Sequence, residues 1–584
     1  MVARTMRIVA RIIGARHDGL IGEPRRTSSR LWSILLLALV SLVSGEGAAH
    51  ELAKLGKLGT VQFPTSARSD DAQAHFLRGV AALHSFWYPV ALDEFRAAAE
   101  LDPDFAMAYW GEAMTHNHPL WGDPQEIEAA RSALSRVPSS SDLQARERAY
   151  LEAVKILYGE GEKIDRDRAY AEAMEQIYLT YPDDREAAAF YALALLGAAR
   201  SDDSMALRTR MKAGALAQEV YRREPDHPGA AHYILHAFDD SDHAVLALHA
   251  ARRYAEIAPG APHALHMPSH IFLQLGLWDQ AAASNEASWA ASDQWVTERR
   301  LSVGERDYHS LHWLFYTYLQ QARYREAKSL LAVIRDSLPQ FPKDRPYNLL
   351  YGRYVEAKMA AGYVIGTRQW EAADAVLGPS PAGDTSGEAG SSDDARLSAR
   401  LVRTPALFAK GFAAAMTGAA DWNERRAELH ELREQIKGRT LPLGESLPEI
   451  LEVQELELTA AAAVTAGRFD EAIQIMEQAT AVMDALPPSA GPPPVIKPPH
   501  ELLGEILLLA GRPAEAAEQF AISLLRYKNR AASLLGTARA ASRKGDPSAA
   551  AHAYEALARQ WTKADAQWPE VEETNAYLKE VRRP

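Results

Sequence analysis

The chain has 584 residues, a formal net charge of −13 and no cysteine. The acidic balance argues against nucleic acid as a partner, because nucleic-acid binding needs a basic surface. The lack of cysteine excludes thiolate metal sites, cysteine nucleophiles and c-type haem attachment. Hydrophobic residues make up 47% of the chain, enough for a large core. They never alternate with polar residues as strands require, so the sequence predicts an all-helical protein.

The first 49 residues differ from the rest in composition. They carry seven arginines against three acidic residues and contain a 13-residue apolar run from Leu31 to Val43. This run is too short to span a bilayer comfortably, and small residues follow it at Ala48 and Ala49. The pattern predicts a signal peptide at residues 1–49 and a periplasmic or secreted protein that has no membrane contact after cleavage. A single-pass N-terminal membrane anchor is the alternative.

A 34-residue pattern recurs along the chain. In residues 72–105 its positions 8, 20, 24, 27 and 32 hold Gly79, Ala91, Phe95, Ala98 and Pro103. Small residues let two helices approach, the aromatic ring fills the gap between them, and proline ends the second helix. Glycine at position 15 with alanine at position 20 marks further units, namely Gly276/Ala281, Gly467/Ala472, Gly511/Ala516 and Gly545/Ala550.

Because 34 residues is the length of one tetratricopeptide repeat, the chain resembles that family over roughly residues 70–563. Stretches 125–225 and 330–450 fit the pattern poorly. Within the family it is similar to bacterial exported members with histidine-rich repeats. The resemblance implies an all-α solenoid of helix-turn-helix units, wound as a right-handed superhelix, with a concave groove that binds ligands.

Residues 378–394 are rich in glycine, serine and proline, which is typical of a flexible linker. The sequence therefore predicts an N-terminal array at 50–377 that contains the groove, this linker, and a C-terminal array at 395–584. The tail from Trp561 is expected to form a capping helix. We expect the linker to be the internal segment most sensitive to protease.

Histidines concentrate in three successive repeats: ten of the 19 lie between residues 227 and 312. In repeats beginning at 228, 262 and 308 they occupy positions 2, 5 and 9, which share one helix face. The resemblance implies that this face lines the concave groove. Imidazoles at i and i+4 can ligate one metal ion, and zinc, copper or iron would suit such a site. The predicted metal ligands are His232, His236, His266, His270, His309 and His312.

Two features complicate this prediction. Pro268 lies between His266 and His270 and is expected to kink the helix there. Histidines on a packed helix face are also common as buried polar residues that hydrogen-bond to their neighbours. Other polar residues fall at groove positions or near aromatic side chains. The additional predicted groove residues are His84, Glu112, His116, His118, His263, Glu457, His500, Glu501 and Glu505.

Two functions remain open from the sequence. One is an exported scaffold whose groove binds a protein or peptide partner of the cell envelope, or a small ligand. The other is a metal-binding protein or metalloenzyme that uses the groove histidines to hold a divalent transition metal. The sequence contains no nucleotide-binding loop, zincin motif or nucleophile elbow, so it predicts no catalytic residue and no reaction.

Overall fold

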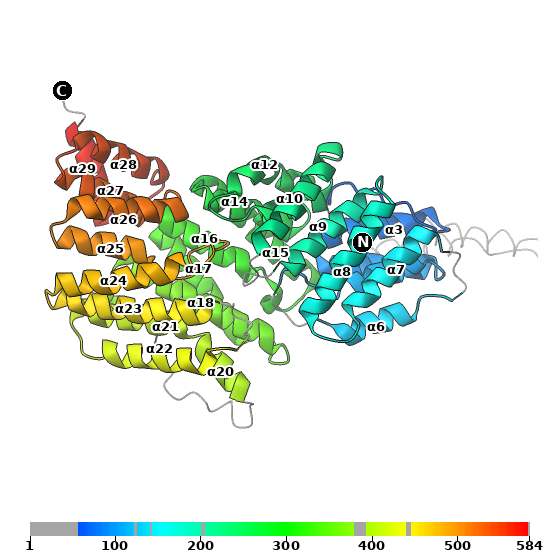
Figure 1. Ribbon diagram of the computed structural model, residues 1–584, viewed down its shortest axis with the longest axis horizontal. Coiled ribbons are helices and arrows are strands. Elements are labelled where there is room, and N and C mark those ends of the chain that lie inside the picture. Colours follow the sequence, from blue (N-terminus) through cyan, green and yellow to red (C-terminus); the bar gives the residue numbers. More distant parts are fainter. Residues whose placement is uncertain are drawn as a thin grey trace, which may run out of the picture. The chain divides into compact units, whose positions relative to one another are not determined.

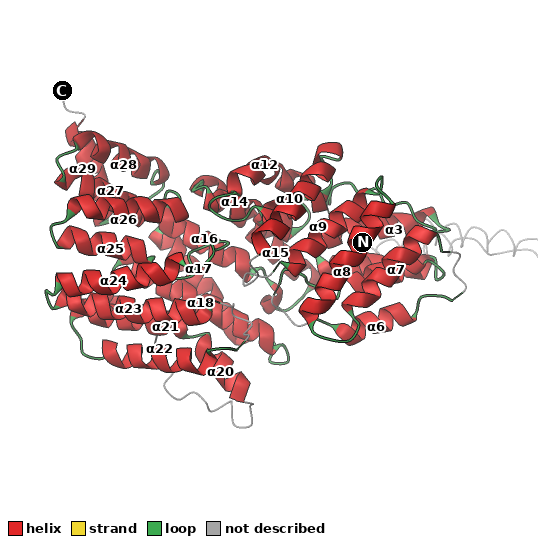
Figure 2. Cartoon of the chain, viewed as in Figure 1, coloured by secondary structure: helices red, strands yellow, loops and turns green. Residues whose placement is uncertain are grey.

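The computed structural model describes residues 56–121, 125–139, 143–199, 205–378, 393–439 and 446–581. Regular structure in these ranges is entirely helical, which confirms the predicted fold class (Figure 2). The predicted signal peptide and nearly all of the predicted linker lie outside the described residues. Among the helices of the described ranges, none has the length and apolar character needed to cross a membrane.

The chain forms its helices in the following order. The first group is α3 (Asp70–His84), α4 (Tyr88–Leu101), α5 (Ala106–Met114), α6 (Ile127–Ser135), α7 (Ala145–Leu157), α8 (Lys163–Thr180), α9 (Arg185–Ala198), α10 (Ala206–Arg223), α11 (Pro228–Ala237), η1 (Ala244–Ala247), α12 (Leu248–Ile257), α13 (Pro262–His266), α14 (Pro268–Gln274) and α15 (Trp278–Arg299). The second group is η2 (Val303–Glu305), α16 (Tyr308–Gln320), α17 (Tyr324–Ser337), η3 (Leu338–Gln340), α18 (Pro346–Thr367), η4 (Trp370–Ala372), α19 (Ala373–Leu377), α20 (Asp393–Leu401), α21 (Thr404–Thr417), α22 (Trp422–Ile436), α23 (Leu447–Thr465), α24 (Phe469–Asp484), α25 (Pro499–Leu509), α26 (Pro513–Arg526), α27 (Ala531–Arg543), α28 (Pro547–Gln560) and α29 (Pro569–Val581).

Neighbouring helices in the sequence are neighbours in space. Each long helix packs against the next one and often against the next but one, as the layers of α23 to α28 show in Figure 1. Such local stacking is the defining property of a solenoid, in which each unit contacts only its neighbours. The fold is therefore an all-α solenoid of helix-turn-helix units.

The repeat pattern has a direct steric cause. The Phe95 ring lies between Gly79 on α3 and Gly111 on α5, where an added Cβ atom would approach it to 2.7 Å and 2.3 Å. Phe520 repeats this arrangement near the C-terminus, between Gly504 and Gly536, with 2.8 Å and 2.2 Å at the equivalent positions. Only glycine leaves room for the ring at these contacts, which is why the spacing of 16 residues recurs.

The predicted turns are present as well. The glycines at repeat position 15 all adopt a left-handed backbone between two helices, with φ from 65° to 75°; they are Gly276, Gly467, Gly511 and Gly545. The alanines five residues later are fully buried. Phe86 and Ala322 hold the same position in other repeats and also have a left-handed φ of 52°, a conformation that costs energy for residues with a Cβ atom.

The C-terminal repeats also contact the middle of the chain. The Trp278 indole Nε1 donates a hydrogen bond to the Asn529 carbonyl (3.0 Å), and the Trp561 indole donates to the Gln320 carbonyl (2.9 Å). Helices α18 and α21, which precede and follow the predicted linker, also pack together. The described residues from Lys57 onward therefore form one compact unit.

Candidate metal centre

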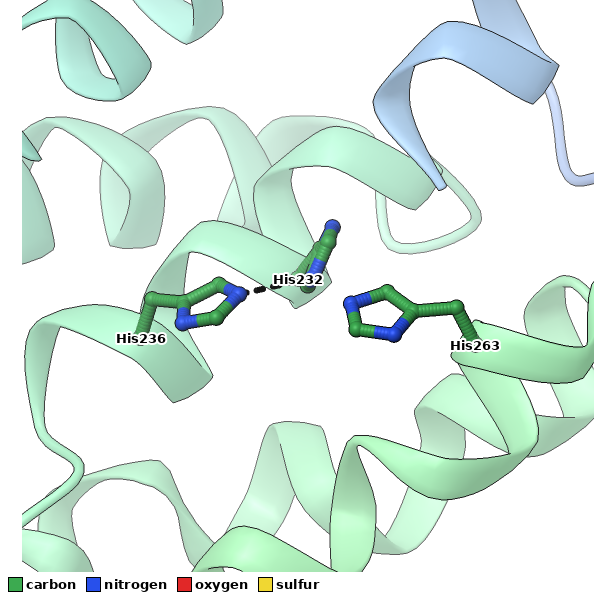
Figure 3. A group of neighbouring side chains, drawn as sticks. All are labelled: His232, His236 and His263. Carbon is green, nitrogen blue, oxygen red and sulfur yellow. Dashed lines mark hydrogen bonds between the residues drawn. The ribbon is translucent and has the colours of Figure 1, made fainter. Parts of the chain in front are cut away.

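Six histidines converge from four helices. His232 and His236 lie on α11, His263 and His266 on α13, His270 on α14 and His309 on α16. They form two groups of three. Within each group the candidate ligand nitrogens lie within 4.8 Å of one another. We call His232, His236 and His263 the first triad, and His266, His270 and His309 the second triad. Figure 3 shows that His263 projects toward His232 and His236 from a different helix.

The second triad has the more constrained proton positions. The Asn285 side-chain amide on α15 donates to the Ala281 carbonyl (2.9 Å), so its oxygen faces His266 and accepts the Nδ1–H of that ring (2.6 Å). The Nδ1–H of His270 donates to the Asp239 carboxylate (2.6 Å). A neutral imidazole carries one N–H, so both Nε2 atoms are left with bare lone pairs.

These two lone pairs face each other at close range. The Nε2 atoms of His266 and His270 are 3.0 Å apart. Two acceptors at this distance repel one another unless a cation lies between them. If both nitrogens bound one ion at the usual metal–nitrogen length of about 2.0–2.1 Å, the nitrogen–metal–nitrogen angle at this separation would be about 95°. The geometry is therefore that of a chelating pair.

The first triad repeats part of this arrangement. His232 donates its Nδ1–H to the backbone carbonyl of His84 (2.7 Å), and its Nε2 lies 3.0 Å from the Nε2 of His236. The Nε2 of His263 is buried without a hydrogen-bond partner among the described residues. A hydrogen bond from Nδ1–H to a fixed acceptor orients a metal-binding histidine and selects the tautomer with a free Nε2.

Burial keeps five of the six imidazoles neutral. Loss of hydration lowers the pKa of His232 to about 3, with smaller contributions from nearby histidines. The same cause, reinforced by the other rings, lowers the pKa of four further members well below the usual range: His236, His263, His266 and His309. Neutral imidazole is the form that binds metal, so the site is ready for a ligand near neutral pH.

The two triads lie side by side. Ring centroids are 6.0 Å apart between His236 and His270, and 6.0 Å apart between His263 and His266. Aromatic rings close the site on two sides: Trp313 lies against His270 at 4.0 Å, and Phe86 against His232 at 4.4 Å. The arrangement can hold two metal ions, each with three nitrogen ligands.

Pro268 interrupts the helix as expected, but the histidine pair survives. Helix α13 ends at His266 and α14 begins at Pro268, with Met267 between them in a helical conformation. The His263 carbonyl still accepts the Met267 N–H (2.9 Å), so the chain continues almost as a helix across the break. His266 and His270 therefore keep their i, i+4 relationship.

The structure places His84 in a separate, self-satisfied network. Its Nε2–H donates to Glu186 (2.7 Å), to which His227 also donates (3.0 Å), and its Nδ1 faces the Tyr233 hydroxyl (2.7 Å). All three members of this histidine–carboxylate group are fully buried. Although burial alone would raise the pKa of Glu186, His227 and His84 lower it to about 2. With every ring nitrogen bonded to protein, this network stabilises the fold and supports the His84 carbonyl beneath His232.

The other predicted groove residues near the N-terminus do not join the triads. Glu112 is buried and forms ion pairs with Arg96 (3.0 Å) and Arg136 (2.5 Å). His116 bonds to Glu126 (2.6 Å). His118 bonds to the Thr115 carbonyl (3.1 Å) and lies against the Tyr88 ring at 4.0 Å between centroids.

The predicted groove residues of the C-terminal array form a second polar cluster. Glu501 is buried against Lys497 (3.0 Å) and Arg530 (2.7 Å), while Glu505 pairs with Lys497 (2.8 Å) and Arg368. Glu457 is fully buried with neither carboxyl oxygen hydrogen-bonded to a described residue, and burial raises its pKa well above the usual range.

Two further predicted histidines, His500 and His312, lie outside the two triads. His500 bonds to Gln519 (2.7 Å) and Asp484 (3.1 Å). His312 belongs to neither triad although it shares helix α16 with His309; it lines a separate hollow beside Lys358 and Arg530. The structure thus brings five of the six predicted metal ligands together and adds His263, which had been predicted for the groove only.

Sequence reasoning missed the residues that hold the histidines in place. Asn285 occupies repeat position 24, which Phe95 and Phe520 fill in other repeats. A polar residue at this core position indicates, from the sequence alone, that the repeat holds a buried polar partner. Asp239 carries no comparable signal, because only the fold brings it to His270 across 31 residues.

Comparison with known proteins adds little to this picture. No protein-family model matches the chain, and no curated sequence matches it. One similar solved structure is the P58(IPK) TPR domain, with 14% identity and a TM-score of 0.20, covering 69% of this chain and all of that one. Another is the APC/C hetero-tetramer Cut9-Hcn1, with 11% identity and a TM-score of 0.24, covering 76% and 97%. At these values the similarity says nothing about ligands or function.

Proposed function

We propose that the protein binds two transition-metal ions, one in each histidine triad. The observation that carries the proposal is the 3.0 Å contact between the Nε2 atoms of His266 and His270, whose other ring nitrogens both donate to fixed acceptors. Protonating His266 would relieve the contact, but burial lowers the pKa of this ring well below the usual range. A metal ion relieves the contact without that cost.

The donor set indicates which metals suit the site. Both triads offer only imidazole nitrogens, and the Asp239 carboxylate is engaged by His270. Magnesium, calcium and manganese prefer oxygen ligands, whereas zinc and copper bind well to imidazole. Three protein ligands leave a coordination position open on each ion, which is the arrangement of catalytic rather than structural zinc sites. We therefore expect zinc or copper, with room for a water or a substrate.

Metal analysis of the purified chain tests the proposal. After chelation and titration with zinc or copper, we expect two ions per chain. The variant H266Q/H270Q should retain one, and H232Q/H236Q should retain the other. H552Q, which changes an exposed histidine on α28, should still bind two. Binding of neither metal by the parent, or equal metal content in all variants, would overturn the proposal.

The helical repeats also make a scaffold of the kind that commonly binds protein partners, and a partner in the cell envelope stays a prediction. Export likewise rests on the sequence of residues 1–49 alone. Sequencing the N-terminus of the protein recovered from the cell envelope tests it, since a chain that still begins before Leu31 would favour the membrane anchor.

A further inference from the structure

A small, partly open hollow lies one helical turn from the second triad. Helix α16 contributes His312 to it, three residues after the metal ligand His309, so the two imidazoles are neighbours on one helix face. Helix α18 forms the opposite side, and its Tyr351 hydroxyl contacts the His309 ring (3.3 Å). The hollow is thus continuous with the elements that build the metal centre.

The walls of this hollow are apolar. Phe315 and Leu319 line it from α16, Ile365 from α18, and Pro493 and Ile496 from the segment before α25. Such walls favour the hydrocarbon part of an organic ligand over a hydrated inorganic ion. They also reduce the local dielectric, which strengthens any charge interaction inside.

One cation in the hollow has no carboxylate against it. Arg530 lines the hollow, but its guanidinium is paired with Glu501 at 2.7 Å and 3.2 Å. Lys358 also lines it; its ammonium lies over the Tyr354 ring, 5.3 Å from the ring centroid, and forms no ion pair with any residue in the described part of the chain. His312 beside it has no hydrogen-bond partner there either, and burial together with Lys358 lowers its pKa well below the usual range. A ligand carrying one negative charge would balance the site.

The proline-rich segment links the hollow to the metal centre. The Ser489 carbonyl accepts a hydrogen bond from Gln274 on α14 (3.0 Å). Gly491 packs against the Trp313 indole, where an added Cβ atom would lie 2.5 Å from the ring. Pro492 and Pro493 then form part of the wall of the hollow. One segment therefore covers both the ring that contacts His270 and the space beside His312.

We propose that this hollow binds a small organic monocarboxylate, with its carboxylate on Lys358 and its hydrocarbon part against Phe315, Leu319 and Ile365. One ammonium without a carboxylate partner matches a monoanion, whereas a phosphate dianion would need further donors. Carboxylate binding follows from the hollow alone. Its role as a substrate position next to an open metal site rests on the proposed metal centre.

Calorimetric titration of the full chain tests the binding. We expect sodium hexanoate to bind the chelator-treated protein at least tenfold more tightly than hexanamide, which has a similar shape but no charge. K358M should lower hexanoate affinity at least tenfold and leave hexanamide unchanged. The control K328M, at an exposed lysine of α17, should behave as the parent. Equal binding of hexanoate and hexanamide, or no effect of K358M in a folded variant, would overturn the inference.

Cobalt substitution tests the position of the ligand and separates the two proposals. With Co²⁺ in the triads, hexanoate should shift the visible absorption of the parent but not of K358M. Hexanoate binding that depends on Lys358 in a protein that takes up no metal would reject the metal centre and keep the hollow as a carboxylate site. Two bound ions without hexanoate binding would reject the hollow alone. Binding without a cobalt shift would overturn its role as a substrate position.

Discussion

Single side chains around the triads decide which nitrogen faces the centre. The Asp239 carboxylate and the Asn285 amide oxygen each accept an Nδ1–H and leave Nε2 free. The amide oxygen of Asn285 is placed by its own hydrogen bond to the Ala281 carbonyl. Metal affinity should therefore depend on residues that never touch the ion.

The variant D239N tests this dependence. Loss of the negative charge makes His270 a weaker base, so we expect metal affinity to fall about 10–100-fold while the helical signal is kept. Competition with a chromogenic chelator measures the affinity. D242N, three residues away and exposed, is the matched control and should match the parent. Equal affinity in D239N and D242N would show that Asp239 does not support the site.

For the network of His84, Glu186 and His227 we expect the opposite result, a loss of stability without a loss of metal. In E186Q an amide N–H would replace one acceptor oxygen and face an imidazole N–H in a fully buried place. An unmet hydrogen bond of this kind costs about 1–3 kcal/mol, so urea denaturation should show reduced stability. Metal content should remain two ions per chain. A variant that loses one ion but keeps its stability would mean that this network is itself a metal site.

At the scale of helices and their connections, the segment before α25 shapes the centre. Gly491 has a φ of 83°, and its α-carbon faces the Trp313 indole. Trp313 in turn lies on His270. The turn glycine Gly467 has a similar φ of 75° but no atom within 4 Å of its Cβ position. Comparing alanine substitutions at Gly467 and Gly491 therefore separates the cost of a left-handed backbone from the cost of contact with Trp313.

We expect G467A to cost about 1 kcal/mol, from the left-handed backbone alone. G491A should cost about 1–3 kcal/mol more, because its methyl group would overlap the indole. It should also weaken metal binding by displacing Trp313. Urea denaturation and metal titration of both variants measure these effects. If both variants lose the same stability and keep the metal affinity of the parent, the segment before α25 does not support the metal centre.

For the whole molecule, the buried histidines link metal, pH and stability. The folded pKa of His232, about 3, lies below the unfolded value of 6.5. Between these values the unfolded chain binds more protons, so the metal-free protein loses stability as the pH falls below 6.5. Each histidine held neutral contributes about 1.4 kcal/mol per pH unit.

Denaturation of chelator-treated protein should therefore show little change in the free energy of unfolding from pH 7.5 to about 6.5, and a decrease from there to pH 5. Zinc at 100 times its dissociation constant should add about 2.7 kcal/mol per site at pH 7.5, and less at pH 5 where protons compete for the ligands. The double variant H266Q/H270Q should show a weaker pH dependence. A metal-free parent whose stability does not change across this range would contradict the neutral state of the cluster.

Much of the fold could be predicted from the sequence, because its determinants are local. Gly79 and Phe95, or Gly467 and Ala472, lie within one repeat, and their sizes dictate how its two helices pack. The i, i+4 pairs on α11 and across α13 and α14 follow from helix geometry in the same way. A 34-residue period then stacks these pairs, so convergence of the histidines could be expected before any coordinates.

Only the tertiary structure decided which polar residues act together. His312 shares a helix face with His309 but lines the adjoining hollow and joins neither triad, and His84 belongs to a closed network with Glu186. Asp239 reaches His270 across 31 residues, and Trp278 reaches Asn529 across 251. The direction of a side chain within a groove depends on the rotation of each helix against its neighbours. That rotation is set by packing summed over the whole array, which a repeat period does not encode.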